Sequence, residues 1–284
     1  MSESPAFIPD YLFLGHITHD VTPDGPRLGG TVSYGAHTAV AMGQKVGILT
    51  SAKPDEPLLA DLPASVRVIN IPAEHTTMFE NRYVGSARTQ YMYHRALTLT
   101  PAMLPPAWRQ ARLIHIAPIA YEVDLAFFTF FEQGAICVTP QGFMRRREAD
   151  GLVKTIHWAD ADRALPHVRL TVFSEEDIQH DPSLEHTFAR LSPIAVLTRA
   201  ERGGTVYQGA ERADFAAIEV EQVGPTGAGD VFASALHIAL DRLGDLPRAI
   251  RVAAYLAGRS ITREGFDSAP TPDEIATAWA MVGV

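Results

Sequence analysis

Short apolar runs alternate with stretches of helical spacing along most of this chain, and this alternation constrains the fold more than any other feature. Each run is long enough for one buried strand. The runs cover residues 11–15, 45–50, 66–71, 113–117, 135–138, 168–173 and 194–197, and helical patterns are expected over residues 31–42, 121–132 and from 227 to the end. Strands that alternate with helices form a mostly parallel sheet with helices on both faces. The sequence therefore predicts an α/β fold.

Residues 76–95 depart from this alternation of strands and helices. They form two β-rich stretches around Gly85, with Met78, Tyr83 and Tyr93 among their apolar and aromatic positions. We expect a small β lid here, to which part of residues 21–30 contributes. A hairpin that extends the main sheet is the alternative. Because no linker rich in Pro, Gly or Ser divides the chain, residues 1–284 are expected to form a single domain.

The charge balance limits the partners of the protein. Its 284 residues include 24 Lys and Arg against 33 Asp and Glu, a formal net charge of −9, which argues against a nucleic-acid partner. No apolar run approaches the roughly 18 residues of a membrane span, and the start, Met-Ser-Glu-Ser-Pro, is acidic where a secretory signal is basic. A single cysteine, Cys137, indicates a reducing compartment. We expect a cytoplasmic protein with no membrane or nucleic-acid partner.

A glycine-rich turn is the strongest chemical signal in the chain. Gly227, Ala228 and Gly229 precede Asp230 and an amphipathic helical pattern. The first amides of a helix lack intrahelical partners and lie at the positive end of its dipole, so small residues there let a phosphate approach. An acid at position 230 suits a base for a hydroxyl that attacks this phosphate. The plainer alternative is a tight turn followed by a favourable acid in the first helical turn.

Two other phosphate-binding motifs do not fit. A dinucleotide fingerprint requires a third glycine at position 232, where this chain has Phe232, and it belongs early in a βαβ unit. A Walker loop requires a lysine after its second glycine, but the stretch from Gly30 to Gly35 continues as Ala36-His37. Neither of these two nucleotide-binding loops is expected.

Residues 226–232, Thr-Gly-Ala-Gly-Asp-Val-Phe, resemble the signature of the ribokinase, or PfkB, family of carbohydrate kinases. Further segments match in the family's order. Residues 15–20 resemble its substrate-binding motif after the first strand, and Gly29-Gly30 resembles its glycine pair beneath the substrate. Residues 198–203 are similar to its nucleotide turn, and residues 253–265 match where it encloses adenine. The resemblance implies a three-layer α/β/α sandwich with a small β lid, as one catalytic domain.

The resemblance also implies a reaction, phosphoryl transfer from ATP with Mg²⁺ to a hydroxyl of a sugar or polyol. Asp230 would be the base, beside the anion-binding Gly227, Ala228 and Gly229. Substrate-binding positions would be Asp20, Gly29, Gly30, Tyr34, Arg88, Gln141 and Arg145. Nucleotide-binding positions would be Ser174, Thr198, Ala200, Gly203, Thr226, Ala254 and Gly258, and Mg²⁺ would lie near Asp177 and Glu176.

Five positions depart from the family pattern. Gly224 stands where the family commonly has Asp, and Tyr34 stands where it often has Asn. The segment Ser174 to Asp177 replaces an Asn-x-x-Glu motif with shorter oxygen-bearing side chains, so metal contact is expected through water. Ala200 replaces a glycine of the nucleotide turn. Neither the change at Gly224 nor the change at Tyr34 removes the base at Asp230.

The acceptor is expected to be polyhydroxylated and uncharged, because Asp20 can accept hydrogen bonds from two adjacent hydroxyls. Residues 19–30 and 140–145 look most like the inositol-kinase branch of the family. A nucleoside kinase is one alternative. Another is a catalytically idle binding regulator, which Gly224 and Ser174 favour. His16 and His19 could be metal ligands, but hydrogen bonding is the more typical role of such a pair. Monomer and homodimer both stay open.

Overall fold

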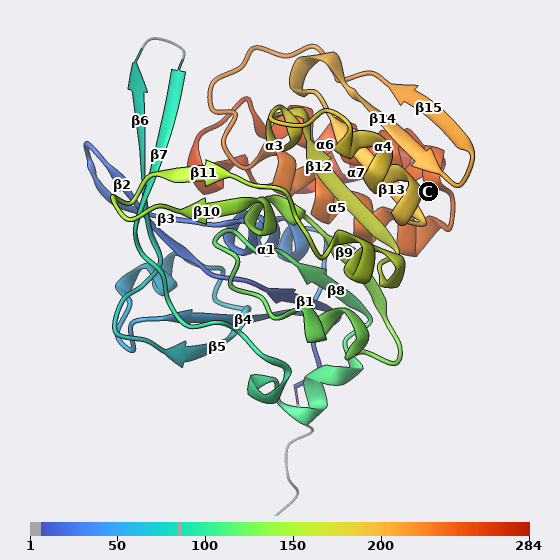
Figure 1. Cartoon of the computed structure of the whole chain (residues 1–284). Helices are drawn as coiled ribbons and strands as arrows, with labels where there is room; N and C mark the ends of the chain where they lie inside the picture. Colours follow the sequence, from blue (N-terminus) through green and yellow to red (C-terminus); the bar gives the residue numbers. More distant parts are fainter. Residues whose placement is uncertain (1–6, 85–86) are drawn as a thin grey trace, which may run out of the picture.

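The computed structural model describes residues 7–84 and 87–284, without the side chains of residues 83, 84, 87 and 88. At its centre is a nine-stranded sheet in the order β15-β14-β13-β12-β9-β8-β1-β4-β5 (Figure 1). The strands are β1 (Tyr11–Leu14), β4 (Val46–Ala52), β5 (Arg67–Pro72), β8 (Leu113–Ile116), β9 (Ala135–Val138), β12 (Leu170–Ser174), β13 (Ile194–Thr198), β14 (Gly204–Gln208) and β15 (Glu211–Phe215). From β13 to β5 all neighbours are parallel. The predicted α/β class and its apolar strands are confirmed.

Helices cover both faces of this sheet, which makes a three-layer sandwich (Figure 1). One face carries α1 (Thr31–Ala41), α5 (Ala228–Leu243), α6 (Leu246–Ser260) and α7 (Pro272–Ala280); the other carries α2 (Ala161–Ala164) and α4 (Leu184–Leu191). Alternate side chains of β1 supply both cores, with Leu12 and Leu14 packed toward α2 and α4. Tyr11 and Phe13 pack beneath α1. The period of two explains why the strands are apolar on both faces.

The segments expected to form the lid fold as a second sheet, in the order β3-β2-β6-β7. Its strands are β2 (Thr18–Thr22), β3 (Gly25–Gly29), β6 (Met78–Val84) and β7 (Ala87–His94). In Figure 1 the β6 and β7 arm projects away from the main sheet. The short pair β10 (Arg145–Arg147) and β11 (Val153–Thr155) lies beside β7, where Met92 N donates to Gly151 O at 2.8 Å. Gly85 itself lies outside the described residues.

The helix expected over residues 121–132 is wrong. Only a 3₁₀ turn forms there, over Leu125–Thr129. The carboxylate of Glu122 is buried and accepts hydrogen bonds from the amides of Ile119 and Ala120, while Leu99 N donates to Glu122 O at 2.7 Å. These bonds hold the segment extended, and Tyr121 adopts a left-handed φ of 56°. Long-range pairing therefore outweighs the apolar spacing of the phenylalanines.

Two further features complete the fold. The antiparallel edge hairpin β14–β15 was not foreseen, although Gly209, at a φ of 60°, marks its turn. Within the described ranges no helix is long and apolar enough to cross a membrane. The chain after α5 is helical to its end, as predicted, apart from its connecting turns. The carboxyl ends of β1, β9, β12 and β13 share one edge of the sheet, because these strands are parallel, and residues predicted to be functional follow each of them.

Candidate active site

The glycine-rich turn lies at the start of α5 and is fixed by close packing. Gly227 is the residue that caps the helix and has a φ of 85°, which favours glycine. A Cβ atom on Gly227 would lie 2.3 Å from the ring of Tyr34 on α1. Two independent reasons, one conformational and one steric, therefore exclude a side chain at this position. Thr226 is exposed immediately before it.

The amides available at this helix start are those of the second and third helical residues. Ala228 N donates to Pro225 O at 3.2 Å, which occupies the Ala228 amide in the turn itself. The amides of Gly229 and Asp230 precede the first intrahelical hydrogen bond, from Val231 N to Gly227 O at 2.9 Å. The positive end of the helix dipole therefore presents two N–H groups to an approaching anion.

Asp230 has the titration behaviour of a base that works near neutral pH. Burial raises the pKa of its carboxyl to about 7, and the negative charge of Asp177 raises this pKa further. A hydrogen bond from Thr31 and the positive charge of Arg145 lower the pKa but do not cancel the effect of burial. A pKa close to the working pH gives a general base both its reactive form and its driving force.

Asp20, the second acid of the candidate site, lies on β2 of the second sheet. Its Oδ1 accepts a hydrogen bond from the Thr18 hydroxyl at 2.7 Å. Burial raises the pKa of Asp20, while the Thr18 hydrogen bond and the charges of His19 and Arg145 lower it. Arg145 therefore acts electrostatically on Asp20 and on Asp230, which lie far apart in the sequence.

Tyr34, on α1, is close enough to both acids for their charges to act on its phenol. Burial raises the pKa of its phenol to about 12, and the negative charges of Asp230 and Asp20 both contribute. The phenol therefore stays protonated at neutral pH and can donate a hydrogen bond. Its ring also packs on Phe266, with centroids 4.9 Å apart. The structure thus brings together three of the predicted residues from three elements, β2, α1 and α5.

The predicted acceptor residues Gln141, Arg145 and Arg88 lie on a 3₁₀ turn and on two strands. Gln141 belongs to the 3₁₀ turn Pro140–Met144, which leads directly into Arg145 at the start of β10. A Cβ atom on Gly142 would lie 2.3 Å from the backbone of Pro118 and Ile119, so this turn lies tightly against the residues after β8. Arg88 belongs to β7, but its side chain lies outside the described residues.

On the donor side, Ser174 and Asp177 bind each other. Ser174 caps the short helix α3 (Glu175–Ile178), and both its amide and its hydroxyl donate to Oδ2 of Asp177 at 2.8 Å. Thr198 is the partner of Ser174 across β12 and β13. The Ser and Asp replacements therefore form a closed capping pair. From this position the charge of Asp177 raises the pKa of Asp230.

These acids can fit Mg²⁺ only together with donor phosphates. Among the described residues no three His, Cys, Asp or Glu side chains group as a metal site. Asp177 and Asp230 repel each other, and a cation between them would relieve that repulsion. Mg²⁺ usually keeps several waters and takes one or two carboxylates plus phosphate oxygens. The donor set of Asp177, with Glu176 beside it on α3, fits that mode of binding.

The turn after β13 keeps its shape despite its alanine. Ala200 adopts a φ of 48°, the left-handed region that a glycine would enter at no steric cost. Gly203, at a φ of 79°, lies so close to β15 that an added Cβ would be 2.0 Å from Phe215 O. Arg202 of this turn forms an ion pair with Glu175 on α3. Ala254 and Gly258, the other predicted nucleotide positions, are half-buried on α6.

Two residues near the site were missed from the sequence. Thr31 follows the glycine pair and bonds to Asp230, and its place at the first position of α1 was the available signal. Glu122 accepts a hydrogen bond from His16 N at 3.0 Å and thereby fixes the end of β1, for which no local signal exists. Both ring nitrogens of His16 are bonded, to Thr77 at 2.7 Å and to Leu97 O at 2.8 Å, so its role is structural.

The comparisons with known proteins agree with this geometry. The sequence model described as pfkB family carbohydrate kinase matches residues 87–274. No curated protein matches the chain significantly.

Solved structures match over nearly the full chain. A pyrophosphate-dependent kinase in the ribokinase family, complexed with a pyrophosphate analog and myo-inositol, has a TM-score of 0.79 and 20% identity, with 94% of this chain and 99% of that chain covered. A ribokinase from Thermotoga maritima has a TM-score of 0.73 and 17% identity. A putative ribokinase II from E. coli in complex with ATP and Mg²⁺ has a TM-score of 0.73 and 19% identity. Both alignments cover 95% of this chain and 99% of the other. These likenesses show a ribokinase-like fold.

Proposed function

The chain belongs to the pfkB family of carbohydrate kinases, and from this premise we propose that it phosphorylates a hydroxyl of an uncharged polyol, with an inositol-like ring as the favoured acceptor. It is a phosphotransferase with an alcohol group as acceptor. The finer assignment of acceptor, donor and residue roles is our proposal. The observation that carries it is the convergence of Asp20 and Asp230 on Tyr34 and Arg145.

An acceptor between the two acids would be held at one end and deprotonated at the other. Asp20 would accept hydrogen bonds from two neighbouring hydroxyls, while Gly29 and Gly30 leave room for the ring to approach the backbone. Tyr34 would donate from its protonated phenol. A cyclic polyol offers hydroxyls on every side, which suits acids that come from opposite walls. The positive charge of Arg145 lowers the pKa of both acids and so favours their ionised forms.

Transfer then requires one bond to form and one to break. The acceptor oxygen attacks the terminal phosphorus of the donor, its proton moves to the Asp230 carboxylate, and the bond to the leaving phosphate oxygen breaks. The amides of Gly229 and Asp230 would stabilise charge on the moving group. When bound, Mg²⁺ would neutralise charge on the donor phosphates, held near Asp177 and Glu176 largely through water.

The donor predicted from the sequence is ATP, with contacts from Ser174, Thr198, Ala200, Gly203, Thr226, Ala254 and Gly258. Among the structural relatives, one was solved in complex with ATP and Mg²⁺, and others are pyrophosphate-dependent kinases. The amide pair at the start of α5 supports any donor with a terminal phosphoryl group. The donor is therefore a question separate from the base and the acceptor.

The idle regulator is the second candidate, and Gly224 is the observation that favours it. A Cβ atom there would lie 2.8 Å from Arg263 O, so the chain has closed over the position where the family commonly has Asp. Against it stands Asp230, whose pKa of about 7 suits a working base. A nucleoside kinase would use the same base, and only the acceptor distinguishes it.

Phosphate-ester formation tests the proposal. The protein is incubated with Mg²⁺, a mixture of ATP and pyrophosphate, and single acceptors: myo-inositol, other inositols, ribose, fructose and nucleosides. Phosphorus NMR detects a new ester whichever donor is used. We expect an ester with an inositol and none above background in the Asp230→Asn control. Acceptor binding by calorimetry without any ester would favour the regulator, and an ester only with nucleosides would favour the nucleoside kinase.

A further inference from the structure

The donor side of the site has a second property, which rests on the proposed function and concerns only what the donor carries behind its phosphates. The transferred phosphorus must lie at the amides of Gly229 and Asp230. Any nucleoside must then extend away from α5. The predicted adenine surface on that side is α6 around Ala254 and Gly258, faced by residues 216–224, which connect β15 to α5.

Ile218 already covers this surface. A Cβ atom on Gly258 would lie 2.2 Å from Cγ1 and 2.7 Å from Cδ1 of Ile218. The isoleucine side chain therefore lies directly against the backbone of α6, with space for glycine only. A planar base is about 3.4 Å thick and requires contact with such a surface on at least one face. Side chain and base cannot occupy the same layer.

The segment that carries Ile218 is tied to α6 at a second place. The amides of Val223 and Gly224 both donate to Ile261 O, at 2.8 and 3.0 Å. Gly224 also approaches Arg263 O so closely that an added Cβ would lie 2.8 Å away. The connecting segment thus touches α6 in its last turn, at Gly258, and again just beyond its end, at Ile261. To admit a base between the two, both contacts would have to open.

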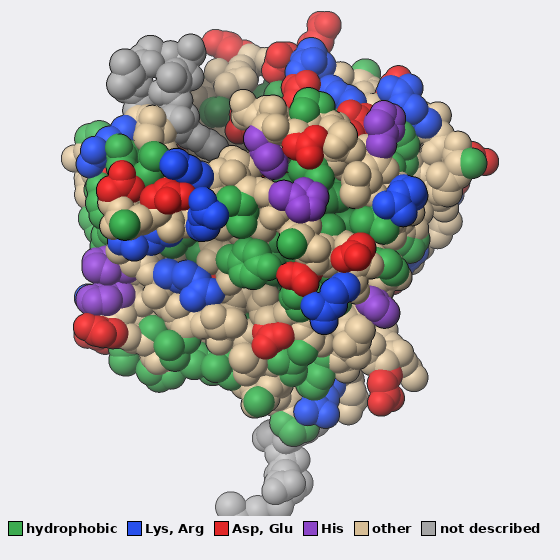
Figure 2. All heavy atoms as spheres, viewed as in Figure 1, with side chains coloured by type: hydrophobic (Ala, Val, Ile, Leu, Met, Phe, Trp, Pro, Cys, Tyr) green, Lys and Arg blue, Asp and Glu red, His purple; other side chains and the backbone are tan. Residues whose placement is uncertain are grey.

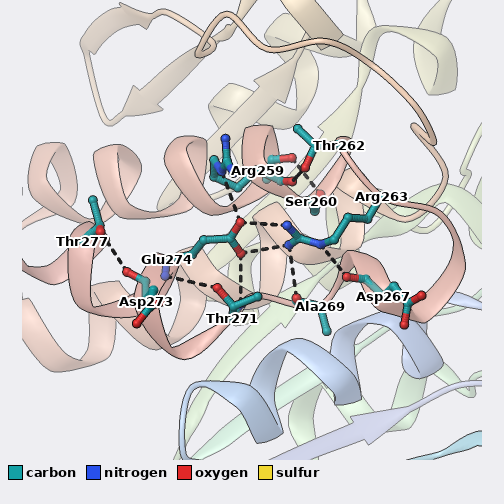
Figure 3. A network of polar contacts seen from close by, with 11 residues as sticks. Arg259, Ser260, Thr262, Arg263, Asp267, Ala269, Thr271, Asp273, Glu274 and Thr277 are labelled. Atoms are coloured by element: carbon teal, nitrogen blue, oxygen red, sulfur yellow. Dashed lines mark hydrogen bonds and ion pairs between the residues drawn. The ribbon is translucent and has the colours of Figure 1, made fainter.

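The wall formed by α6 and the loop after it is itself held in place. Figure 3 shows the Arg263 guanidinium between Glu274 of α7 and the carbonyl groups of Asp267 and Ala269. Its Nη1 and Nη2 lie 2.8 and 2.9 Å from the two Glu274 oxygens, and Arg259 adds a contact at 3.2 Å. In the same loop, Phe266 stacks on His37 with ring centroids 4.2 Å apart. Moving this wall would break buried charge-assisted hydrogen bonds.

We propose that the phosphoryl donor of this protein carries no nucleobase and is an inorganic polyphosphate, of which pyrophosphate is the smallest. The acceptor oxygen forms a bond to one phosphorus of pyrophosphate, and the bridging P–O bond breaks with its electron pair on the leaving orthophosphate. The acceptor proton passes to Asp230 and leaves with orthophosphate. The products are the phosphate ester and one orthophosphate, so no further reactant is needed.

The donor preference is measured with one acceptor held constant. Initial rates of ester formation by phosphorus NMR or by labelled acceptor are compared for pyrophosphate, tripolyphosphate, ATP and GTP, each with Mg²⁺. We expect kcat/KM for pyrophosphate or tripolyphosphate to exceed that for ATP by about 100-fold, because a steric exclusion removes the nucleoside's binding contribution and adds a clash. An equal or larger value for ATP overturns the inference but leaves the kinase intact. No ester with any donor overturns the proposed function instead.

A matched pair of variants identifies the side chain responsible. Ile218→Ala removes the atoms that cover Gly258, and we expect kcat/KM for ATP to rise about 10-fold while that for pyrophosphate stays within about twofold. Val220→Ala, on the same segment, is the control and should change neither value. If kcat/KM falls for both donors in Ile218→Ala while the melting temperature is unchanged, Ile218 is not the group that excludes the nucleobase.

Discussion

Gly29 and Asp20 lie so close that a Cβ atom on Gly29 would be 2.2 Å from Oδ2 of Asp20 and 2.5 Å from the hydroxyl of Thr18. This contact places the predicted acceptor-binding acid directly on the glycine pair, although the two residues are on different strands of the second sheet. It explains why the sequence keeps a glycine at position 29, since any side chain would displace the carboxylate.

The first prediction follows from this contact. Gly29→Ala should raise the KM for the acceptor by about 10-fold or more, because the displaced Asp20 loses its hydrogen bonds to the acceptor. The effect on kcat should be smaller, since Asp230 is not touched. Steady-state kinetics measures both constants. Val21→Ala, an exposed change on β2, is the control; an unchanged KM in Gly29→Ala would separate Asp20 from acceptor binding.

The second prediction concerns the base. Asp230→Asn should lower kcat by about 10²-fold or more, the usual scale for a positioned base, with little change in donor affinity. Single-turnover rates give the chemical step, and calorimetry gives donor affinity in the same preparation. A variant with near-normal turnover would show that another group accepts the proton.

The third prediction is a pH profile. Since the base must be deprotonated and burial raises its pKa to about 7, kcat/KM should rise with pH and level off above about 7. The hydrogen bond from Thr31 lowers the pKa of Asp230, so Thr31→Val should move this limb to higher pH and Thr31→Ser should restore it. Asp177→Asn should move it to lower pH, because it removes a charge that raises the pKa. If the pH profiles of kcat/KM of Thr31→Val and Asp177→Asn coincide with that of the wild type, the assignment of Asp230 as the base is wrong.

The fourth prediction concerns the stability of the cradle. Gly227→Ala places a Cβ against the Tyr34 ring at a φ of 85° and should lower the free energy of unfolding by about 1–3 kcal/mol. Tyr34→Ala removes the collision but not the backbone cost. In the Tyr34→Ala background, Gly227→Ala should therefore lower the free energy of unfolding by only about 1 kcal/mol. Urea unfolding of the four members of this cycle measures the difference. If the changes in free energy of unfolding caused by Gly227→Ala and Tyr34→Ala are additive, the two residues are not in contact.

The fifth prediction tests the Glu274 network. Burial raises the pKa of Glu274, but hydrogen bonds from Arg263, Thr271 and Arg259 outweigh it and lower the pKa to about 2. A carboxyl group whose pKa is lower in the folded than in the unfolded protein stabilises the fold at pH values above its unfolded-state pKa, here near 4.5. This contribution is lost as the pH falls toward 2. Glu274→Gln should therefore destabilise the protein at pH 7 by about 1–3 kcal/mol. Urea unfolding should show that the difference in free energy of unfolding between the wild type and Glu274→Gln is smaller at pH 3 than at pH 7. Asp273→Asn, a change at the exposed neighbouring residue, serves as the control.

Much of the fold could be predicted because local patterns carried it. The central parallel strands β1, β4 and β8 are buried along their whole length between two helical layers, and the glycine-rich start of α5 could be recognised from consecutive residues. The segment 121–132 could not. Its apolar spacing favoured a helix, but the hydrogen bonds that Glu122 accepts from the distant amides of His16 and Leu99 decide its path.

What the sequence alone determined, then, is the α/β class, the cradle at Gly227 to Asp230 and the identity of the acids, because each depends on neighbours within a few positions. Only the tertiary structure decided that the charges of Asp20 and Asp230 both act on Tyr34, that burial raises the pKa of Asp230 to about 7, and that Ile218 lies on Gly258. Proximity, burial and steric exclusion are properties of segments that meet only after the sheet and its helices have packed, and no local pattern records them.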